Sequence, residues 1–266
     1  MNSPSIEIPK RRNPFIPQKP NSEIWLPPHR QIHPVQAAPF GILLRYGGRK
    51  FLPTDIPGLA LWLDPSDATS VTIDAGAVSA LADKSGNGRH FSQAVPGNRP
   101  VVASINGRAA LDFNLDFLEG PSLSALTGCD SFIVAQNDVA VPELQALNHS
   151  GPGDGWMLFS GDIYDSTGTS LRKTVGPPGV GLDVARIVNV VSVAGEYTYR
   201  LSGTQLYTTV ANTVDWDALR TVMGGDPING APWDGRIGEW LIYEAMLTTA
   251  ERALVDAYLQ AKWGAL

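Results

Sequence analysis

The chain has 266 residues, of which 43% are hydrophobic and 17% are charged, and its formal net charge at pH 7 is −6. A chain of this length can bury a sizeable core, while the negative charge argues against a domain that binds nucleic acid, because phosphate contacts need clustered Lys and Arg. The single cysteine, Cys129, excludes an intrachain disulfide, and no run of roughly 18 apolar residues indicates a membrane span.

Residues 1–57 differ in composition from the rest of the chain. They hold eleven of the 21 prolines and sum to a charge of about +5, whereas the remaining 209 residues sum to about −11. Proline removes backbone donors and biases the preceding residue toward extended conformations, so helix and central strand are both disfavoured. Large apolar side chains recur between the prolines, as in a peptide that places side chains into successive pockets of a partner. We predict an extended Pro-rich anchoring arm that gains its order by docking on another protein.

Within this arm the sequence indicates which side chains make the contacts. Three large apolar residues are the expected anchors and two basic residues the expected charged contacts: Phe15, Trp25, Leu26, Arg11 and Arg12. An acidic protein groove fits this small basic cluster better than phosphate groups do. Further along, residues 41–48 have the pattern of a short strand ending in a turn, and residues 53–58 form the expected hinge into the domain.

From Leu59 onward, short β-like runs are separated by Gly, Asn, Asp and Pro. The clearest runs are Leu59–Leu63, Ala109–Phe113, Ser131–Gln136, Gly155–Ser160, Arg186–Val193, Glu196–Leu201 and Arg236–Tyr243. Their spacing and turn residues predict an all-β fold, an antiparallel jelly-roll sandwich over residues 58–266, rather than alternating strands and helices. One C-terminal helix is expected to pack on this sandwich.

That helix is predicted to begin after Thr248. Thr248 and Glu251 have the spacing of a capping box, and apolar residues follow at helical spacing. The residues on this stripe are Leu254, Val255, Tyr258, Leu259 and Lys262. Gly264 is the expected end of the helix.

Three segments together carry a family resemblance: residues 58–67 (GLALWLDPSD), residues 83–90 (DKSGNGRH), and residues 235–243 (GRIGEWLIY) followed by residues 251–263. They are similar to concanavalin A-like (LamG-like) lectin/glucanase jelly-roll domains of the kind found in bacteriophage head and tail structural proteins. The resemblance covers most of residues 58–266 and implies the fold. It implies little about function, because folds of this kind carry lectins, glycosidases and purely structural modules.

Laminarinase-type relatives of such a fold carry two catalytic carboxylates in a Glu-x-Asp-x-x-Glu strand, and the nearest match here runs from Glu239 to Glu244. The middle Asp is replaced by Leu241, and residues five apart on a regular strand face opposite sides. The sequence also has no Gly-x-Ser-x-Gly, His-Glu-x-x-His or P-loop motif. We therefore predict that the chain is not an enzyme and has no catalytic residues.

The segment from Asp83 to Gly88 begins like a calcium loop, with oxygen-bearing side chains at alternate positions, but its twelfth position is Ala94 rather than a bidentate Glu. A tight turn, in which Asp83 and Asn87 bond local backbone groups, is the preferred interpretation, and calcium binding is the alternative. Two weaker calcium candidates are the acidic pairs Asp64/Asp67 and Asp162/Asp165. We predict no metal site and no cofactor.

A glycan site needs an aromatic ring for the apolar face of a sugar, and amides or carboxylates for its hydroxyls. The loop 224–233 and the residues before it supply this chemistry through Trp216, Asp226, Asn229 and Trp233. The alternative is that Trp233 packs beneath its own loop and that the polar residues only stabilise the Gly-rich turn. Trp156 is a lesser candidate. The remaining tryptophans of the strand and helix patterns are predicted core residues: Trp62, Trp240 and Trp263.

Together these patterns favour a bacteriophage virion structural protein, a capsid or tail decoration or fibre-like module assembled in the host cytoplasm. Its arm is expected to bind other virion proteins while the jelly roll faces outward. The alternative is a carbohydrate-binding receptor-recognition protein that contacts host-surface glycans, and a polysaccharide hydrolase is the third hypothesis. Nucleic acid is not an expected partner. A homo-oligomer is compatible with a fibre, although the sequence has no heptad repeat.

Overall fold

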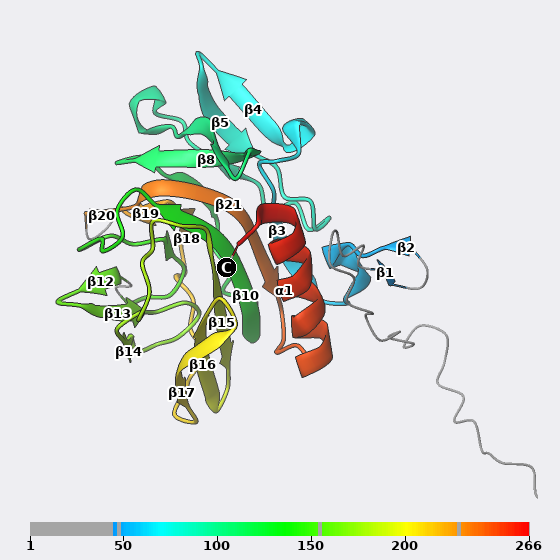
Figure 1. Cartoon of the computed structure of the whole chain (residues 1–266), viewed down its shortest axis with the longest axis vertical. Coiled ribbons are helices and arrows are strands. Elements are labelled where there is room, and N and C mark those ends of the chain that lie inside the picture. Colours follow the sequence, from blue (N-terminus) through cyan, green and yellow to red (C-terminus); the bar gives the residue numbers. More distant parts are fainter. Residues whose placement is uncertain (1–44, 47–48, 154–155, 228–229, 266) are drawn as a thin grey trace, which may run out of the picture.

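The computed structural model describes residues 45–46, 49–153, 156–227 and 230–265, without the side chains of residues 45, 46 and 156. Across this part of the chain nearly all regular structure is antiparallel β-sheet, and one α-helix follows the last strand (Figure 1). The all-β class and the C-terminal helix are therefore confirmed. Within these residues, no α-helix combines the length and the apolar character that a membrane crossing requires.

The largest sheet has eight strands. Seven run in the order β17-β16-β15-β10-β21-β8-β7, and β3 pairs with β21 off this path. The strands are β3 (Leu59–Leu63), β7 (Val101–Ile105), β8 (Arg108–Asn114), β10 (Gly128–Asn137), β15 (Arg186–Val193), β16 (Glu196–Leu201), β17 (Thr204–Thr209) and β21 (Asp234–Tyr243). β21 pairs with β10, β8 and β3, so the last strand of the chain joins segments from its beginning and its middle (Figure 1).

The second sheet has six strands in the order β11-β18-β9-β6-β5-β4. They are β4 (Val71–Asp74), β5 (Ala77–Leu81), β6 (Phe91–Ser92), β9 (Leu118–Pro121), β11 (Asn148–His149) and β18 (Arg220–Met223). Three small sheets complete the fold: β12 (Trp156–Phe159) with β13 (Asp162–Asp165) and β14 (Lys173–Gly176), β1 (Arg45–Tyr46) with β2 (Arg49–Lys50), and β19 (Gly225–Asp226) with β20 (Ala231–Pro232). The 3-10 turns are η2 (Pro53–Asp55), η3 (Ala68–Ser70) and η4 (Pro96–Asn98).

The main hydrophobic core lies between the two large sheets. Trp240 of β21 and Phe91 of β6 meet edge to face there, with ring centroids 5.9 Å apart. Both side chains are fully buried, and the Trp240 indole donates a hydrogen bond to the Ser131 hydroxyl at 3.0 Å. Burial of each large apolar side chain contributes about 1.5–3 kcal/mol, so contacts of this kind hold the two sheets together.

The helix α1 (Thr249–Trp263) covers the other face of the eight-stranded sheet (Figure 1). Thr248 and Glu251 form the predicted capping box, and Gly264 ends the helix in the left-handed conformation, with φ at 60°. Its buried stripe consists of Leu254, Val255, Tyr258, Leu259 and Trp263. The helical period of these residues accounts for a second core on the outer side of the sheet.

Residues before Gly58 also belong to the folded body. Phe51 and Ile56 are buried in the same cluster as α1, and the Tyr243 hydroxyl donates to the Pro53 carbonyl at 3.0 Å. The sequence placed the domain boundary at Gly58 because residues 53–58 have the composition of a hinge. The structure extends the folded body toward the N-terminus, since these apolar side chains fill the space beside α1.

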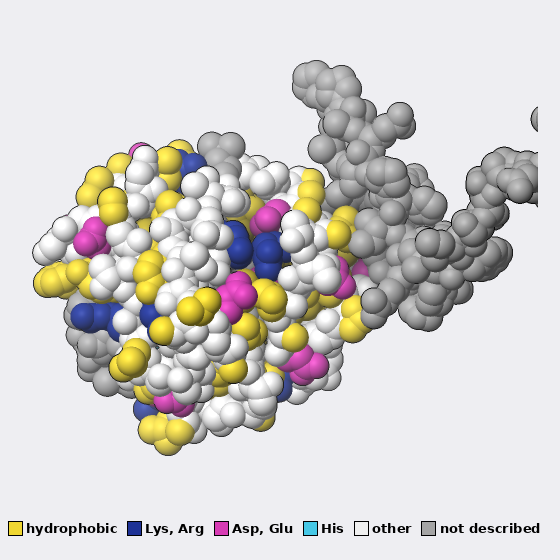
Figure 2. Space-filling model, turned by 90° about the horizontal axis from the view of Figure 1, so that it is seen from below, with side chains coloured by type: hydrophobic (Ala, Val, Ile, Leu, Met, Phe, Trp, Pro, Cys, Tyr) yellow, Lys and Arg dark blue, Asp and Glu magenta, His cyan; other side chains and the backbone are white. Residues whose placement is uncertain are grey.

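One face of the molecule, seen in Figure 2, carries hydrophobic, basic and acidic side chains intermixed. Near its centre, Lys and Arg side chains lie beside Asp and Glu side chains. No broad area of a single charge therefore develops on this face.

Candidate functional site

A cleft of about 530 Å³ opens beside α1, between the helix, the end of β3 and the segment that follows β2. We call it the α1 cleft. Its walls include Leu52, Trp62, Asp64, Asp67, Lys84 and Lys262, and Lys50 and Arg108 lie at its rim. Ionisable side chains beside aromatic rings in a concave site are the combination expected of a functional site.

Glu239 of β21 lies beneath this cleft and is fully buried. Its Oε1 accepts hydrogen bonds from the Trp62 indole at 2.6 Å and from the Tyr258 hydroxyl at 2.9 Å. Its Oε2 accepts from the Lys262 ammonium and from the Trp263 indole, both at 2.7 Å. Burial raises the pKa of Glu239, and the charge of Lys262 opposes that rise. Four donors from β3 and α1 thus hold the helix against the sheet through one carboxyl group.

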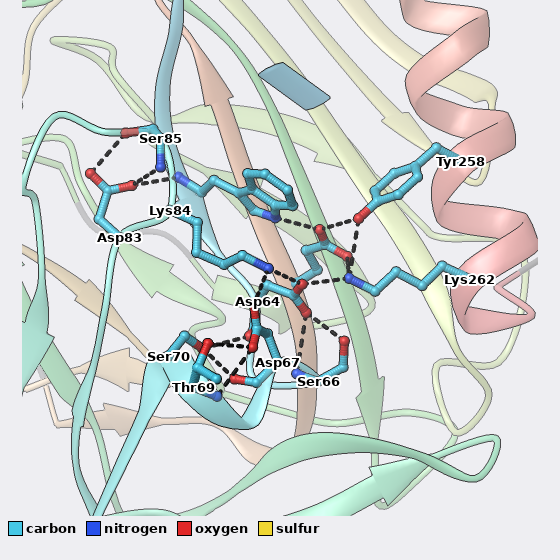
Figure 3. A network of polar contacts seen from close by, with 12 residues as sticks. Asp64, Ser66, Asp67, Thr69, Ser70, Asp83, Lys84, Ser85, Tyr258 and Lys262 are labelled. Carbon is cyan, nitrogen blue, oxygen red and sulfur yellow. Dashed lines mark hydrogen bonds and ion pairs between the residues drawn. The ribbon is translucent and has the colours of Figure 1, made fainter. Parts of the chain in front are cut away.

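Two lysines and two aspartates extend this network toward solvent (Figure 3). Asp64 pairs with Lys84 at 2.9 Å and with Lys262 at 2.8 Å, and Asp67 pairs with Lys84 at 2.8 Å. Burial of Asp64 opposes its ionisation, but the two ammonium groups outweigh burial and lower its pKa. The pKa of Asp67 is lowered as well, first of all by its hydrogen bond with Lys84. Both aspartates are therefore ionised near neutral pH.

Hydrogen bonds within the turn after β3 orient Asp64 and Asp67 independently of their ion pairs with the lysines. Asp64 accepts a hydrogen bond from the Ser66 hydroxyl at 2.6 Å, and the Ser70 hydroxyl donates to the Asp64 carbonyl at 2.8 Å. Asp67 caps η3 by accepting from the backbone amide of Thr69 at 3.1 Å. Short polar side chains favour such local bonds, so this stretch of sequence fixes the carboxylates by itself.

The two lysines of the cleft differ in the hydrogen-bonding capacity that they retain. All three donors of Lys262 are engaged by oxygen atoms within 3.1 Å. Lys84 uses two donors, on Asp64 and Asp67, and its ammonium lies 4.3 Å from the centroid of the Trp62 ring. Lys262 therefore builds the cleft, whereas Lys84 has one donor left for a ligand.

Two further cations, Lys50 and Arg108, are exposed at the rim of the α1 cleft. Arg108 Nε donates to the backbone carbonyl of Lys262 at 2.6 Å, in the last turn of α1. That end of a helix carries the negative pole of its dipole, which favours a cation. Within the described residues, neither rim cation forms an ion pair.

A second, more open groove of about 560 Å³ runs over the outer face of the six-stranded sheet. Its lining includes His90, Ser92, Phe117, Glu119 and Leu219. Glu119 is half-exposed and pairs with Arg220 at 2.9 Å. Exposed pairs of this kind hold their side chains only weakly, so this groove lacks the buried scaffold that orients the polar groups of the α1 cleft.

The structure places the aromatic side chains predicted to bind a glycan in the core. Trp216 and Trp233 are 4% and 1% exposed and belong to the cluster between the two large sheets. The Trp216 indole donates to the Leu126 carbonyl at 3.0 Å. Neither ring presents a face to solvent, because rings of this size gain more by filling the core than by lying on a loop. Asn229 lies outside the described residues.

Asp226 is also buried, and it meets a histidine to which the sequence assigned no role. Its Oδ2 lies 3.4 Å from Nδ1 of His149, and Oδ2 of Asp217 lies 3.0 Å from Nε2 of the same ring. Burial lowers the pKa of His149, but the two carboxylates outweigh burial and the pKa is raised overall. Asp226 thus contributes to an internal charge cluster rather than to an open surface. A lone histidine in a short strand carries no motif from which this contact could be inferred.

The other predicted residues fall into two groups. Trp62, Trp240 and Trp263 are buried, which confirms that they are core residues. The Trp156 side chain and the predicted arm contacts lie outside the described residues: Arg11, Arg12, Phe15, Trp25 and Leu26. Their anchoring role stays a prediction.

The turn predicted at Asp83 is local only in part: Asp83 accepts from the backbone amide of Ser85 at 2.9 Å, but the Asn87 side chain bonds the backbone of β3 rather than that of its own turn. The Asp83 carboxylate accepts from the backbone amides of Trp62 and Arg89, each at 3.0 Å, and the Asn87 amide donates to the Leu59 carbonyl at 2.9 Å. The oxygen atoms of Asp83 are thus engaged by protein donors. Among the described residues, no three His, Cys, Asp or Glu side chains are grouped closely enough to hold a metal ion.

Glu239 and Glu244 do not share a cleft, as their spacing on one strand predicts. Glu239 is buried under α1, whereas Glu244 follows the end of β21 and is exposed. Tyr243 packs on the same side as Glu239, while Trp240 and Ile242 face the core between the sheets. The alternation of side chains along the strand separates the two carboxylates.

No protein-family model matches the chain, and no curated protein sequence matches it. Solved structures with a similar fold include Trypanosoma rangeli sialidase in complex with 2,3-difluorosialic acid, which is 18% identical, has a TM-score of 0.52, and covers 77% of this chain and 33% of that chain. Domain 4 of AbnA, a GH43 extracellular arabinanase from Geobacillus stearothermophilus, in complex with arabinotriose, is 15% identical, has a TM-score of 0.51, and covers 74% of this chain and 97% of that chain. The binding domain of Paraclostridial mosquitocidal protein 1 is 11% identical, has a TM-score of 0.53, and covers 78% of this chain and 55% of that chain.

At these identities the likeness shows the fold alone, an all-β domain of the kind found within a sialidase, an arabinanase and a binding domain. The chain spans about a third of the length of the sialidase chain. The sequence-based prediction that this chain is not an enzyme is corrected, because a sialidase and an arabinanase domain share its fold. The missing sequence motifs therefore do not place the chain outside the enzymes.

Proposed function

We propose that the chain is a carbohydrate-binding domain and that the α1 cleft is its ligand site. The observation that carries the proposal is the pair Lys84 and Asp67 on the wall of the cleft, which ion pairs hold in position before a ligand arrives. Ordering a long side chain on binding costs about 0.5–1.5 kcal/mol, and a preformed arrangement avoids that cost.

The chemistry of the cleft fits a saccharide. Sugar hydroxyls both donate and accept hydrogen bonds, and the cleft offers a partner for each role. The Asp67 carboxylate accepts and has 35% of its side chain exposed, while no oxygen atom of the described residues accepts from the third donor of Lys84, whose side chain is 23% exposed. Leu52 is 39% exposed and supplies an apolar contact for a sugar ring.

The similar structures support a carbohydrate over other ligand classes. The arabinanase domain, which is matched over 97% of its length, was solved in complex with arabinotriose. The sialidase was solved with a sialic acid derivative. The proposal carries this ligand class over to the present chain, while the position of the site rests on the cleft itself.

A glycan array with wild-type protein and Asp67→Asn tests the proposal. We expect the wild type to bind at least one class of saccharide, and the variant to bind it about 10-fold more weakly, because one charge-assisted hydrogen bond is lost. Asp74→Asn is the matched control, because Asp74 is an exposed residue of β4 that pairs with Arg99 away from the cleft, and this variant should bind like the wild type. A wild type that binds nothing on the array contradicts the proposal, and so does unchanged binding by Asp67→Asn.

A virion role and the jelly-roll assignment remain predictions from the sequence. The residues expected to attach the chain to a particle lie outside the described part, and none of the three similar structures is a virion protein by name. Deletion of residues 1–40 tests the attachment. We expect a soluble, folded domain that no longer joins particles, and recovery of the truncated protein on particles at wild-type occupancy would contradict an anchoring arm.

A further inference from the structure

We infer that the α1 cleft selects acidic saccharides, those that carry a carboxylate or sulfate group, and that the rim residues Arg108 and Lys50 recognise the acidic group. This inference rests on the proposed function, because it names the class of ligand that the same cleft takes. A neutral saccharide needs partners for its hydroxyls only. The rim adds two positive charges that no acidic side chain of the described residues neutralises.

The inner network of the cleft leaves these two rim charges uncompensated. Lys84 and Lys262 share three carboxylates at 2.7–2.9 Å, those of Asp64, Asp67 and Glu239. The inner network therefore has no positive charge to spare for a ligand. Arg108 and Lys50 lie outside that network, and residues 49–266, which contain both of them, sum to about −10. Two cations that pair with no acidic side chain of the described residues form a local positive site, which attracts anions.

Arg108 is held in a position suited to an anion. It is the first residue of β8, and its Nε is fixed by the bond to the Lys262 carbonyl at 2.6 Å. Both Nη groups remain, and no oxygen atom of the described residues accepts from them. A guanidinium oriented in this way binds a carboxylate or sulfate through two parallel hydrogen bonds. Lys50 of β2 adds a second charge at the same rim.

The inner wall distinguishes an acidic saccharide from a free anion. A sulfate or acetate ion at the rim would leave Lys84 and Asp67 without a ligand, although both have unused capacity. The cleft, at about 530 Å³, is also far larger than such an ion. A saccharide with one acidic substituent meets the rim cations and the inner wall together.

Isothermal titration calorimetry on the full chain tests the inference with three acidic probes, each beside its neutral counterpart. The pairs are oligogalacturonate with its carboxyl-reduced form, a sulfated galactan oligosaccharide with its desulfated form, and sialyllactose with lactose. We expect at least one acidic probe to bind about 10-fold more tightly than its counterpart. Its affinity should fall as sodium chloride is added, because the rim is exposed and its charges are screened.

Rim variants assign the effect to the two cations. Arg108→Gln and Lys50→Gln should each weaken binding of the acidic probe, by about 10-fold for Arg108→Gln, and leave the neutral counterpart unchanged. The Tm of Lys50→Gln should stay at the wild-type value, because that side chain is exposed and forms no ion pair within the described residues. Arg108→Gln also loses the bond to the Lys262 carbonyl, so its Tm should fall slightly, and its binding is measured well below that Tm. Arg172→Gln is the matched control, because Arg172 is an exposed arginine beside β14, outside the lining of the cleft, and it should change neither affinity.

The outcomes separate the two levels of the proposal. Equal affinity for acidic and neutral probes overturns the inference and leaves the proposed function intact. Failure to bind any saccharide overturns the proposed function and the inference with it. If sodium sulfate at the concentration of the acidic probe displaces that probe, the inference that the cleft selects acidic saccharides is overturned. The rim would then hold an adventitious ion only.

Discussion

The indole nitrogen of Trp62 donates a 2.6 Å hydrogen bond to the Glu239 carboxylate, 177 residues further along the chain. Trp62 belongs to β3 and Glu239 to β21, which pair side by side with Leu63 opposite Trp240. The same carboxylate oxygen accepts from Tyr258 of α1 at 2.9 Å. One buried acceptor thus joins the first strand of the large sheet, its last strand and the helix.

Replacing Glu239 with Gln should lower the free energy of unfolding by about 3 kcal/mol. The substitution leaves the Lys262 ammonium with fewer carboxylate partners and turns one acceptor into a donor that faces other donors. Urea unfolding followed by tryptophan fluorescence measures the change. Glu244→Gln is the matched control, because Glu244 is exposed five residues later, and its change should stay within about 0.5 kcal/mol. Equal effects of the two substitutions would show that the buried network does not stabilise the fold.

The close approach of α1 to the sheet gives a second prediction. At Gly238 of β21, an added Cβ would lie 2.9 Å from atoms of the buried Trp263 ring. Gly238→Ala should therefore destabilise the protein by about 1–3 kcal/mol, because the ring or the helix must move. Circular dichroism should record a lower Tm for this variant. In the control Gly97→Ala, the new methyl group meets no atom within 4 Å, so the Tm should stay near the wild-type value. An unchanged Tm for Gly238→Ala would contradict this packing.

The parts of the fold that follow from local patterns were predictable from the sequence. β15 and β16 have the predicted bounds, and the capping box of Thr248 and Glu251 marks the start of α1. Several of the strands missed are short: β5, β9 and β18 have four or five residues and gain their structure from pairing within the second sheet. Segments of this length carry too little periodicity for a strand to be inferred from them alone.

The α1 cleft was harder to predict, because contacts between distant residues create it. Asp64 and Asp67 suggested at most a calcium site, and Lys262 was predicted only as part of a helix stripe. A lysine on the buried stripe of a helix does carry information, since a charge in that position needs an acidic partner. The partner, Glu239, cannot be identified without the packing of α1 against β21. At Trp233 the sequence predicted a binding residue where the structure has a core residue. An aromatic residue after a Gly-rich loop has the same sequence pattern whether it is buried or exposed.

The charge cluster around His149 predicts a pH dependence of stability. Burial lowers the pKa of the folded histidine, but Asp226 and Asp217 raise it above the ordinary value of 6.5. The folded chain therefore binds this proton more tightly than the unfolded chain does. The stability it contributes is fully present below a pH of about 6.5 and is lost as the pH rises through the folded pKa. Asp217, whose pKa is lowered, stays ionised throughout that range.

Urea unfolding of the wild type between about pH 6 and pH 9 should show this loss as a declining free energy of unfolding. His149→Gln removes the titrating group, so its decline over the same range should be smaller. Parallel curves for the two proteins would show that the ring carries no extra proton in the folded state. An NMR titration of the His149 ring protons provides the direct measurement, and a pKa at or below 6.5 would contradict the raised value.

Cys129 provides a reporter for opening of the sandwich. It is the single cysteine of the chain, it is fully buried in β10, and burial raises the pKa of its thiol. Only an accessible thiolate reacts with a disulfide reagent. The labelling rate of native protein should therefore be lower than that of protein in denaturing urea by a factor on the order of 100 or more. Glu239→Gln should accelerate native labelling by about 100-fold if opening is global, because the same loss of about 3 kcal/mol favours the open state. Rapid labelling of the native wild type would instead place this thiol at an accessible position.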